Sequence, residues 1–398
     1  MKTKENITLF TAIILIASML RAPITGVGSV VSTIGEDLAL SSSASGFLTT
    51  IPLLAFGLLS VLVGKFSQQL GVGRMILGGL LFLTVGIIAR SYTGITGLFA
   101  GTAVIGMGIA IGNVLVPAIV KASFPTKVGI MTSAYTTAMS VFSGIAGGIS
   151  VPLTNIWGWE LALIIWIVLP LLTITLWLPQ IKMKLKGEPQ RKGSNIIKDS
   201  TTWWIAIYMG VQSMLFYCFV AWFATILQSY GYDQETAGYY NSAYLFLGIP
   251  GSILIPAMAG KRKSQSGIAV ALSLLYIVGI GAMLFAKNQW ALLLAVICCG
   301  FCSGSCIALA MALFGLHTKN AADTSALSGL AQSVGYILAA LGPIIMGKLF
   351  DLSDNWTVPM LFLLGTTIIL TGLGYMAGRD RIINEPVPES HPWKFSWN

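Results

Sequence analysis

Arg21 is the residue of this sequence whose type fits its surroundings least. It lies in the apolar stretch IILIASMLRAPITGVGSV, residues 13–30. A charged side chain at the centre of a membrane-spanning helix costs about 2.5–3.5 kcal/mol, so such a residue is a functional candidate by default. Arg21 lies 14 residues after Ile7, where the apolar run begins. At 1.5 Å per residue this is about 21 Å, too deep for the guanidinium to reach the membrane surface easily.

The sequence offers Arg21 no obvious counter-ion. Of the 14 acidic residues, none lies in the middle third of an apolar run. One hypothesis is that a water-filled cavity or a bound anion supplies the missing partner, which makes Arg21 an anchor for a substrate. The other hypothesis is structural: Arg21 caps backbone carbonyls or pairs with Glu160 or Asp323. We favour the substrate anchor, because intramembrane charges face cavities or partners.

The residues after Arg21 predict a bend at the same depth. Pro23 cannot donate a hydrogen bond to the carbonyl of Met19, so we expect a kink there. Thr25 lies four residues after Arg21 and shares its helix face. The first span is therefore expected to bend at a cavity and to present both a cation and a hydroxyl to it.

Composition defines the elements that must position these groups. The chain has 398 residues, of which 55% are hydrophobic and 9% charged, against about 25% charged in soluble domains. Twelve apolar runs are each long enough to cross a hydrocarbon core of about 30 Å as a helix. They are residues 7–31, 44–64, 75–92, 97–120, 128–150, 160–179, 203–228, 238–258, 266–286, 290–315, 323–347 and 356–377. The runs do not alternate as barrel strands do, so we expect an all-α integral membrane protein with 12 transmembrane helices.

The cations orient these spans. Of the 23 Lys and Arg residues, 19 fall on the side that holds both termini, and only Arg90, Lys287 and Lys348 fall on the other. Cytoplasmic loops carry such an excess, so both termini are expected in the cytoplasm and the protein in the cell membrane. The net charge of +9 is then a topology signal and a contact for anionic lipid. It gives no support for nucleic-acid binding.

A polar, basic segment divides the chain in two. We expect an N-terminal six-helix bundle at residues 1–180, a cytoplasmic linker at 181–201, a C-terminal six-helix bundle at 202–378 and a cytoplasmic tail at 379–398. Two such halves, related as parallel repeats, place a binding site between them at the membrane midplane.

The segment GKFSQQLGVGR, residues 64–74, resembles the loop motif of the major facilitator superfamily. Gly64, Gly71 and Arg74 fit that motif, whereas two glutamines stand where its acid and first base usually are. Such a loop makes a tight turn that latches one conformation. Without the acid, the latch would rest on neutral hydrogen bonds and helix-end dipoles.

Further segments resemble the cyanate/nitroimidazole transporter family of that superfamily. They are LRAPITGVG (residues 20–28), LTTIPLLAFGL (48–58), VGIIAR (85–90), GIAIGNVLVPAIVKASFP (108–125), GVQSMLFYCFVAWFATIL (210–227) and LSGLAQSVGYILAALGPIIMGKLFD (327–351). They occur in family order and cover nearly the whole chain. One departure is Ala224, where the family usually has proline, so any gating bend there is in doubt.

Other polar residues in the middle of spans could line the same cavity. Together with Arg21 and Thr25, the predicted substrate contacts are Asn113, Gln212, Ser213, Tyr217, Tyr244, Gln332 and Tyr336. Hydrogen bonds between helices are the alternative for each, worth about 0.6 kcal/mol on average. Phe216, Tyr217, Tyr244 and Tyr336 also permit an aromatic-lined cavity. The predicted gating or conformational residues are Pro23, Gly64, Gly71, Arg74 and Arg90, of which Arg90 could instead snorkel to the outer surface.

The resemblance implies a secondary active or facilitative transporter that moves a small polar or anionic solute, cyanate-like or nitroimidazole-like, by alternating access. The alternative is an efflux exporter of small heteroaromatic compounds. A membrane-embedded enzyme or sensor would need a catalytic set or a soluble output domain, and we find neither. Cys298, Cys302 and Cys306 share one helix face, but with only two histidines in the chain we predict packing, no metal site and no cofactor. We expect a monomer whose partners are the bilayer and a small-molecule substrate.

Overall fold

The computed structural model describes residues 2–40, 42–184 and 196–383. Within these ranges the chain is helical and contains no strand, as the sequence predicts. The α-helices are α1 (Lys2–Met19), α2 (Ala22–Asp37), α3 (Ser42–Leu70), α4 (Val72–Tyr92), α5 (Gly94–Ser123), α6 (Val128–Ile164), α7 (Val168–Trp177), α8 (Ser200–Ser229), α9 (Gln234–Ala259), α10 (Ser266–Met283), α11 (Gln289–Leu316), α12 (Ala321–Ser353) and α13 (Thr357–Ala377). Short 3-10 helices lie at Ile165–Ile167, Leu178–Gln180 and Ile196–Lys198. Most of the predicted linker and tail lies outside the described residues.

The described helices form 11 segments that are apolar and long enough to cross a membrane. One of them, Val128–Gln180, has 53 residues. At 1.5 Å per residue it would be about 80 Å long, more than twice the thickness of a hydrocarbon core. It is also interrupted at Gly158, whose φ of 84° leaves the helical region. This segment is therefore long enough for two passes.

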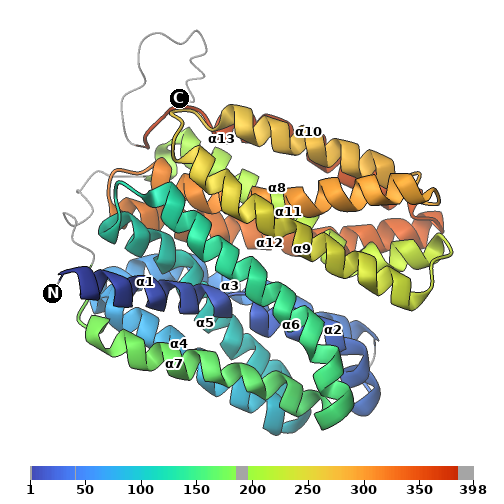
Figure 1. Cartoon of the computed structure of the whole chain (residues 1–398), viewed down its shortest axis with the longest axis horizontal. Helices are drawn as coiled ribbons and strands as arrows, with labels where there is room; N and C mark the ends of the chain where they lie inside the picture. The colour runs from blue at the N-terminus through green and yellow to red at the C-terminus, as the bar shows by residue number, and fades with distance from the viewer. Residues whose placement is uncertain (1, 41, 185–195, 384–398) are drawn as a thin grey trace.

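The helices gather into two groups. In Figure 1, α1–α7 (the first group) occupy the lower part of the molecule and α8–α13 (the second group) the upper part. Contacts between the groups run mainly along α3 with α12 and α6 with α9. We call the end that holds Arg74, Lys127, Arg262 and Lys319 the basic end, and the other the opposite end.

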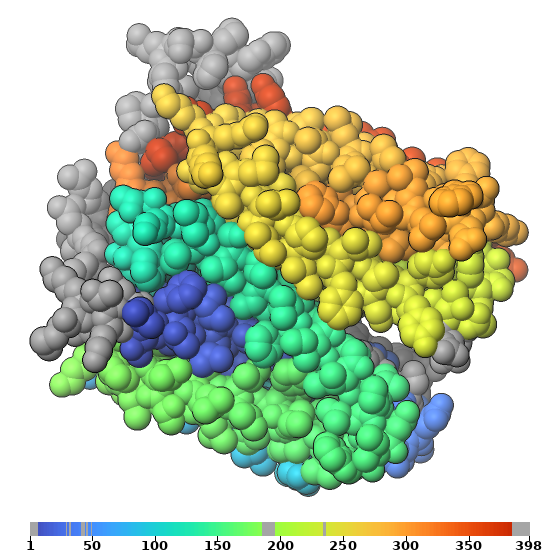
Figure 2. Space-filling view, in the orientation of Figure 1, coloured from blue at the N-terminus to red at the C-terminus, as the bar shows by residue number. Residues whose placement is uncertain are grey.

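The two groups are packed closely at the basic end. Lys121 Nζ donates a hydrogen bond of 3.0 Å to the carbonyl of Gly315. A Cβ atom on Gly129 would lie 2.9 Å from the Cα atom of Gly260, so the backbones of α6 and α9 meet there. Hydrogen bonds between the groups, among the described residues, extend from this end to the middle of the bundle. Figure 2 shows a hollow between the groups toward the opposite end.

The first span is broken rather than kinked, and the break precedes Pro23. Helix α1 ends at Met19 and α2 begins at Ala22, so Leu20 and Arg21 form a turn between them. Pro23 lies in the first turn of α2, where a missing N–H leaves no helical bond unmade. Because proline is favoured there, the helix restarts just before it instead of bending through it.

The predicted loop at residues 64–74 is almost entirely helical. Helix α3 continues to Leu70 and α4 starts at Val72, so the connection is Gly71 alone. Its φ of 88° lies in the left-handed region that favours glycine. Gly64 belongs to α3, and a Cβ atom there would lie 3.3 Å from the carbonyl oxygen of Ser325. Arg74 is exposed.

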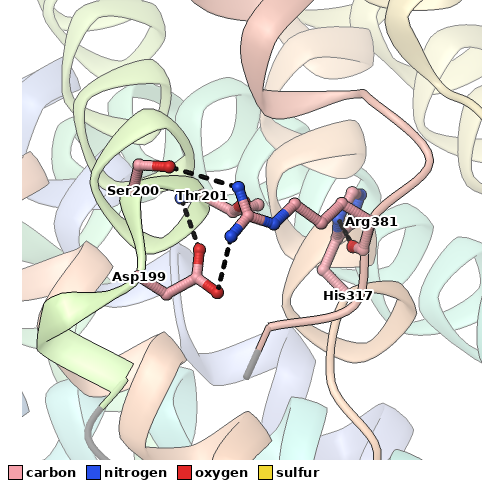
Figure 3. A network of polar contacts seen from close by, with 5 residues as sticks. All are labelled: Asp199, Ser200, Thr201, His317 and Arg381. Carbon is pink, nitrogen blue, oxygen red and sulfur yellow. Dashed lines mark hydrogen bonds and ion pairs between the residues drawn. The ribbon is translucent and has the colours of Figure 1, made fainter. Parts of the chain in front are cut away.

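The chain after α13 is pinned to the basic end of the second group (Figure 3). Arg381 Nη2 pairs with Asp199 Oδ2 at 3.4 Å, and Asp199 Oδ1 caps α8 by accepting from the N–H of Thr201 at 2.8 Å. His317, which is 2% exposed, faces the carbonyl of Arg381 at 2.8 Å through Nδ1 and Gln265 Oε1 at 3.1 Å through Nε2. Both ring nitrogens thus face acceptors, and a neutral ring can donate to one of them.

Burial lowers the pKa of His317 to about 4, against the opposing effect of its bond to the Arg381 carbonyl. The unfolded chain binds the proton with a pKa of about 6.5, so stability is lost as the pH falls from 6.5 to 4. We expect wild type to lose about 2 kcal/mol more than His317→Asn between pH 7.5 and 4.5. Unfolding of the purified protein in detergent at both pH values measures this. Equal losses in the two proteins would contradict it.

Candidate functional site

Arg21 lies where the two groups of helices meet. It precedes α2 in the first group, and its guanidinium carbon lies 4.5 Å from the centre of the Phe216 ring on α8 of the second group. This is a cation–π contact, worth about 0.5–1 kcal/mol when the cation is not fully removed from water. Arg21 is partly exposed, and among the described residues its guanidinium has no ion pair and no hydrogen bond. The predicted lack of an internal counter-ion therefore holds within the part of the chain that the structure describes.

A row of aromatic rings continues from this contact. Phe216 packs edge-on against Tyr217 with ring centres 5.2 Å apart, and Tyr217 lies 6.5 Å from Tyr336 on α12. Tyr336 in turn lies 4.8 Å from Phe56 on α3. The row thus starts at Arg21 of the first group, crosses the second group and returns to the first. Of the predicted residues, the structure brings Arg21, Tyr217 and Tyr336 together.

The sequence interpretation missed Phe56. It lies within the segment that resembles the transporter family, but nothing in its spacing indicates that it meets a ring 280 residues away. It is 1% exposed and completes the aromatic row.

Two of the predicted amide residues join the two groups of helices, and one of them, Gln332, lies one helical turn before Tyr336 on α12. Gln332 Nε2 of α12 donates to the carbonyl of Asn113 on α5 at 2.9 Å, and to Ser328 Oγ at 2.9 Å. The side-chain oxygens of Gln332 and Asn113 are buried and have no hydrogen-bond partner in the described structure. An unpaired buried acceptor costs about 1–3 kcal/mol, so these oxygens are suited to an N–H donor of a ligand or to water.

Gln212 and Ser213 interact mainly within α8. Gln212 Nε2 donates to Ser213 Oγ at 2.7 Å and to the carbonyl of Met209 at 3.1 Å. The side-chain oxygen of Gln212 is a third buried amide oxygen without a partner among the described residues. In both Gln212 and Gln332 the side-chain nitrogen makes all the hydrogen bonds that the described structure shows.

Two predicted contacts are placed within a single group. Thr25 Oγ1 lies 3.2 Å from the carbonyl of Ser143 on α6, so its hydroxyl serves the packing of α2 against α6. Tyr244 on α9 is fully buried and stacks on Phe219 with ring centres 5.3 Å apart. Its hydroxyl has no hydrogen-bond partner among the described residues.

Arg90 does not snorkel to the surface. It lies near the end of α4, is 1% exposed, and donates from Nη1 to the carbonyl of Pro23 at 2.7 Å. The sequence places it correctly near the end of a span, but linear distance does not tell which face of α4 carries it. Its partner belongs to the broken first span, two residues after Arg21.

The arrangement is suited to binding a small solute. A cation and aromatic faces meet between the two groups of helices, and the helices that carry the rings or pack on them also hold buried amide oxygens without a partner in the described structure.

Comparison with known proteins decides the class. A family model described as the Major Facilitator Superfamily matches residues 11–343. The chain belongs to the Major Facilitator Superfamily. It is a multi-pass transporter of the cell membrane that moves small solutes, and the resemblance to the cyanate/nitroimidazole transporters is confirmed.

Among curated proteins, an uncharacterized transporter of Bacillus subtilis (strain 168), YycB, is 43% identical over 96% of this chain and 96% of its own length. A 2-nitroimidazole transporter of Escherichia coli (strain K12) is 36% identical over 96% and 98%. The cyanate transport protein CynX of the same organism is 23% identical over 90% and 94%. Among solved structures, the proton:xylose symporter XylE aligns with a TM-score of 0.75 at 10% identity, covering 96% of this chain and 98% of that one, which shows a shared fold.

The contact between Arg21 and Phe216 predicts an energetic coupling. We expect the losses of unfolding free energy in Arg21→Met and Phe216→Leu to be non-additive. The coupling energy should be about 0.5–1 kcal/mol, because either change alone removes the cation–π contact. Thermal unfolding of the four proteins in detergent gives this value. As a control, Phe216→Tyr keeps an aromatic face and should keep the coupling. Strictly additive losses would show that the two side chains do not interact.

Proposed function

We propose that this transporter binds a small planar solute of the nitroimidazole kind against Arg21 and carries it across the membrane by alternating access. The observation that carries the proposal is the guanidinium of Arg21 over the Phe216 ring, unpaired among the described residues, where the two groups of helices meet. A guanidinium offers N–H donors to a nitro group or an anion. The neighbouring rings offer faces on which a heteroaromatic ring can stack.

The unpaired amide oxygens complete this chemistry. An imidazole N–H is a hydrogen-bond donor, and Asn113 and Gln332 leave side-chain oxygens free to accept it. A cyanate-like anion could use the cation but would leave the oxygens and the aromatic faces unused. The relative named as a 2-nitroimidazole transporter is also more similar, at 36% identity, than the one named for cyanate, at 23%. These points favour the heteroaromatic solute over a small inorganic anion.

The transport cycle is proposed as rocking of two six-helix halves, residues 1–180 and 202–378. The basic end faces the cytoplasm in this proposal, because cytoplasmic loops carry the excess of Lys and Arg. The close contacts at the basic end and the hollow at the opposite end then correspond to a conformation closed to the cytoplasm. Export of small heteroaromatic compounds is the second candidate, favoured by the aromatic row itself.

Ligand-induced thermal stabilisation tests the substrate class. We expect 2-nitroimidazole to raise the Tm of the purified protein, and potassium cyanate to raise it no more than potassium chloride does. A rise with cyanate alone would favour the small-anion substrate. No rise with either compound would remove the proposed substrate class.

Arg21 variants test the role of the anchor. We expect Arg21→Ala and Arg21→Lys to lower uptake of 2-nitroimidazole into proteoliposomes at least tenfold, because a bound nitro group loses about 1.5–3 kcal/mol of charged hydrogen bonding. Arg262→Ala removes an exposed cation at the basic end and should leave uptake unchanged. Full uptake by both Arg21 variants would show that Arg21 is not the anchor.

Gly329 gives a test of rocking. A Cβ atom on Gly329 of α12 would lie 2.6 Å from the carbonyl oxygen of Ser60 on α3, so Gly329→Val should disfavour closure of the basic end. Residue 325 is buried beside Gly64, so a cysteine there reports on opening. We expect N-ethylmaleimide to alkylate Ser325→Cys at least fivefold faster when Gly329→Val is also present than when it is absent. Mass spectrometry of the peptide measures the rate.

Gly281→Val is the matched control, because a Cβ atom there meets nothing within 4 Å. Gly281→Val in the Ser325→Cys background should be alkylated at the same rate as Ser325→Cys alone. An unchanged rate in Gly329→Val would argue against opening of the basic end along α3 and α12.

A further inference from the structure

Arg90 is a second cation within the membrane spans of the first group, and unlike Arg21 it is buried. Only 1% of it is exposed, although it carries a charge and belongs to a membrane span. Its one hydrogen bond among the described residues runs from Nη1 to the carbonyl of Pro23, at 2.7 Å. Its Nε and Nη2 atoms are buried and unpartnered in the described structure. Burying a cation in this way is costly. The hydrogen bond from Arg90 to the Pro23 carbonyl must therefore contribute something that offsets this cost.

The contact lies at a helix start that no side chain caps among the described residues. Arg21 occupies the cap position of α2, where no side chain accepts from the first free N–H groups. Ser, Thr, Asp and Asn are the residues that normally fix such a start. The first turn of α2 is instead held from outside, by Arg90 of α4 on Pro23 and by Thr25 against the Ser143 carbonyl of α6.

Electrostatics acts against this arrangement. The start of a helix carries a partial positive charge, and here the two guanidinium groups of Arg21 and Arg90 belong to residues beside it. No ion pair to either Arg21 or Arg90 is present among the described residues. These positive charges disfavour the helix start. A charge-assisted bond to a backbone carbonyl, worth about 1.5–3 kcal/mol, can hold it in place.

We propose that Arg90 is a positioning residue for solute binding: through the carbonyl of Pro23 it fixes the turn that carries Arg21 over the Phe216 ring. The inference rests on the proposed function for its effect on transport. Arg90 does not touch the solute in this scheme, and it acts only through the place of Arg21. Its free Nε–Nη2 edge is the side of a guanidinium that fits two oxygens at once, so direct binding of the solute by Arg90 is the competing outcome of the test.

Hydrogen–deuterium exchange tests the positioning without any solute. We expect Arg90→Met to speed exchange of the amides of residues 20–27 at least tenfold, with the rest of the chain unchanged. Arg90→Lys, whose ammonium can still donate to the Pro23 carbonyl, should restore most of the protection. Arg262→Met is the surface control and should match wild type. Unchanged protection of residues 20–27 in Arg90→Met would overturn the proposal, whether or not 2-nitroimidazole is transported.

A double-mutant cycle on 2-nitroimidazole uptake separates positioning from the other roles. We expect Arg90→Met to raise KM about tenfold with Vmax within threefold, and to add nothing to KM when Arg21 is already Gln. An equal rise of KM in both backgrounds would mean that Arg90 acts on the solute independently, and an unchanged KM with a lowered Tm would mean a purely structural role. Either result overturns the proposal. If Arg21→Gln alone leaves KM unchanged, the proposed function fails, and the exchange experiment still decides the role of Arg90.

Discussion

The structure depends on the cost of placing one guanidinium in a membrane span without a carboxylate beside it. Three features lower this cost for Arg21: the aromatic face of Phe216, the break between α1 and α2, and partial access to solvent. Each of these three features depends on further residues. The break needs a proline that can start a helix, the aromatic face must come from the other group of helices, and the new helix start must be held from outside. The turn that carries Arg21 thus links α2, α4 and α6 of the first group to α8 of the second.

Packing of the two groups follows a different rule. Away from Arg21 and Lys121, glycines, hydroxyls and backbone carbonyls make many of the contacts between them, as in the pairs Gly129 with Gly260 and Thr136 with the carbonyl of Ser252. Such contacts are short-ranged and carry no net charge, so they can separate without stranding an ion in the membrane. The Gln332 bond to the Asn113 carbonyl also leaves only dipoles behind when it opens. This chemistry suits an interface that opens and closes.

Much of this was predictable from the sequence, for reasons that differ by residue. The all-helical membrane fold follows from composition, and the isolation of Arg21 follows from its depth and from where the acids lie. Phe56 and the Pro23–Arg90 bond were not predictable, because both join positions far apart in the chain and the faces of straight apolar helices look alike in sequence. The continuation of α3 to Leu70 was missed because hydropathy marks where the membrane ends and not where the helix does.

The isolation of Arg21 also bears on how a membrane potential could act on the cycle. With a neutral nitroimidazole bound, Arg21 keeps its positive charge in the loaded and in the empty carrier, whereas an anionic solute would cancel that charge in the loaded carrier. A potential of 100 mV acts on a single charge with about 2.3 kcal/mol across the full membrane. Voltage would then act on both the loaded and the empty step for the neutral solute, and mainly on the empty step for an anion. The membrane potential would thus act on turnover through the side chain that we propose to bind the solute.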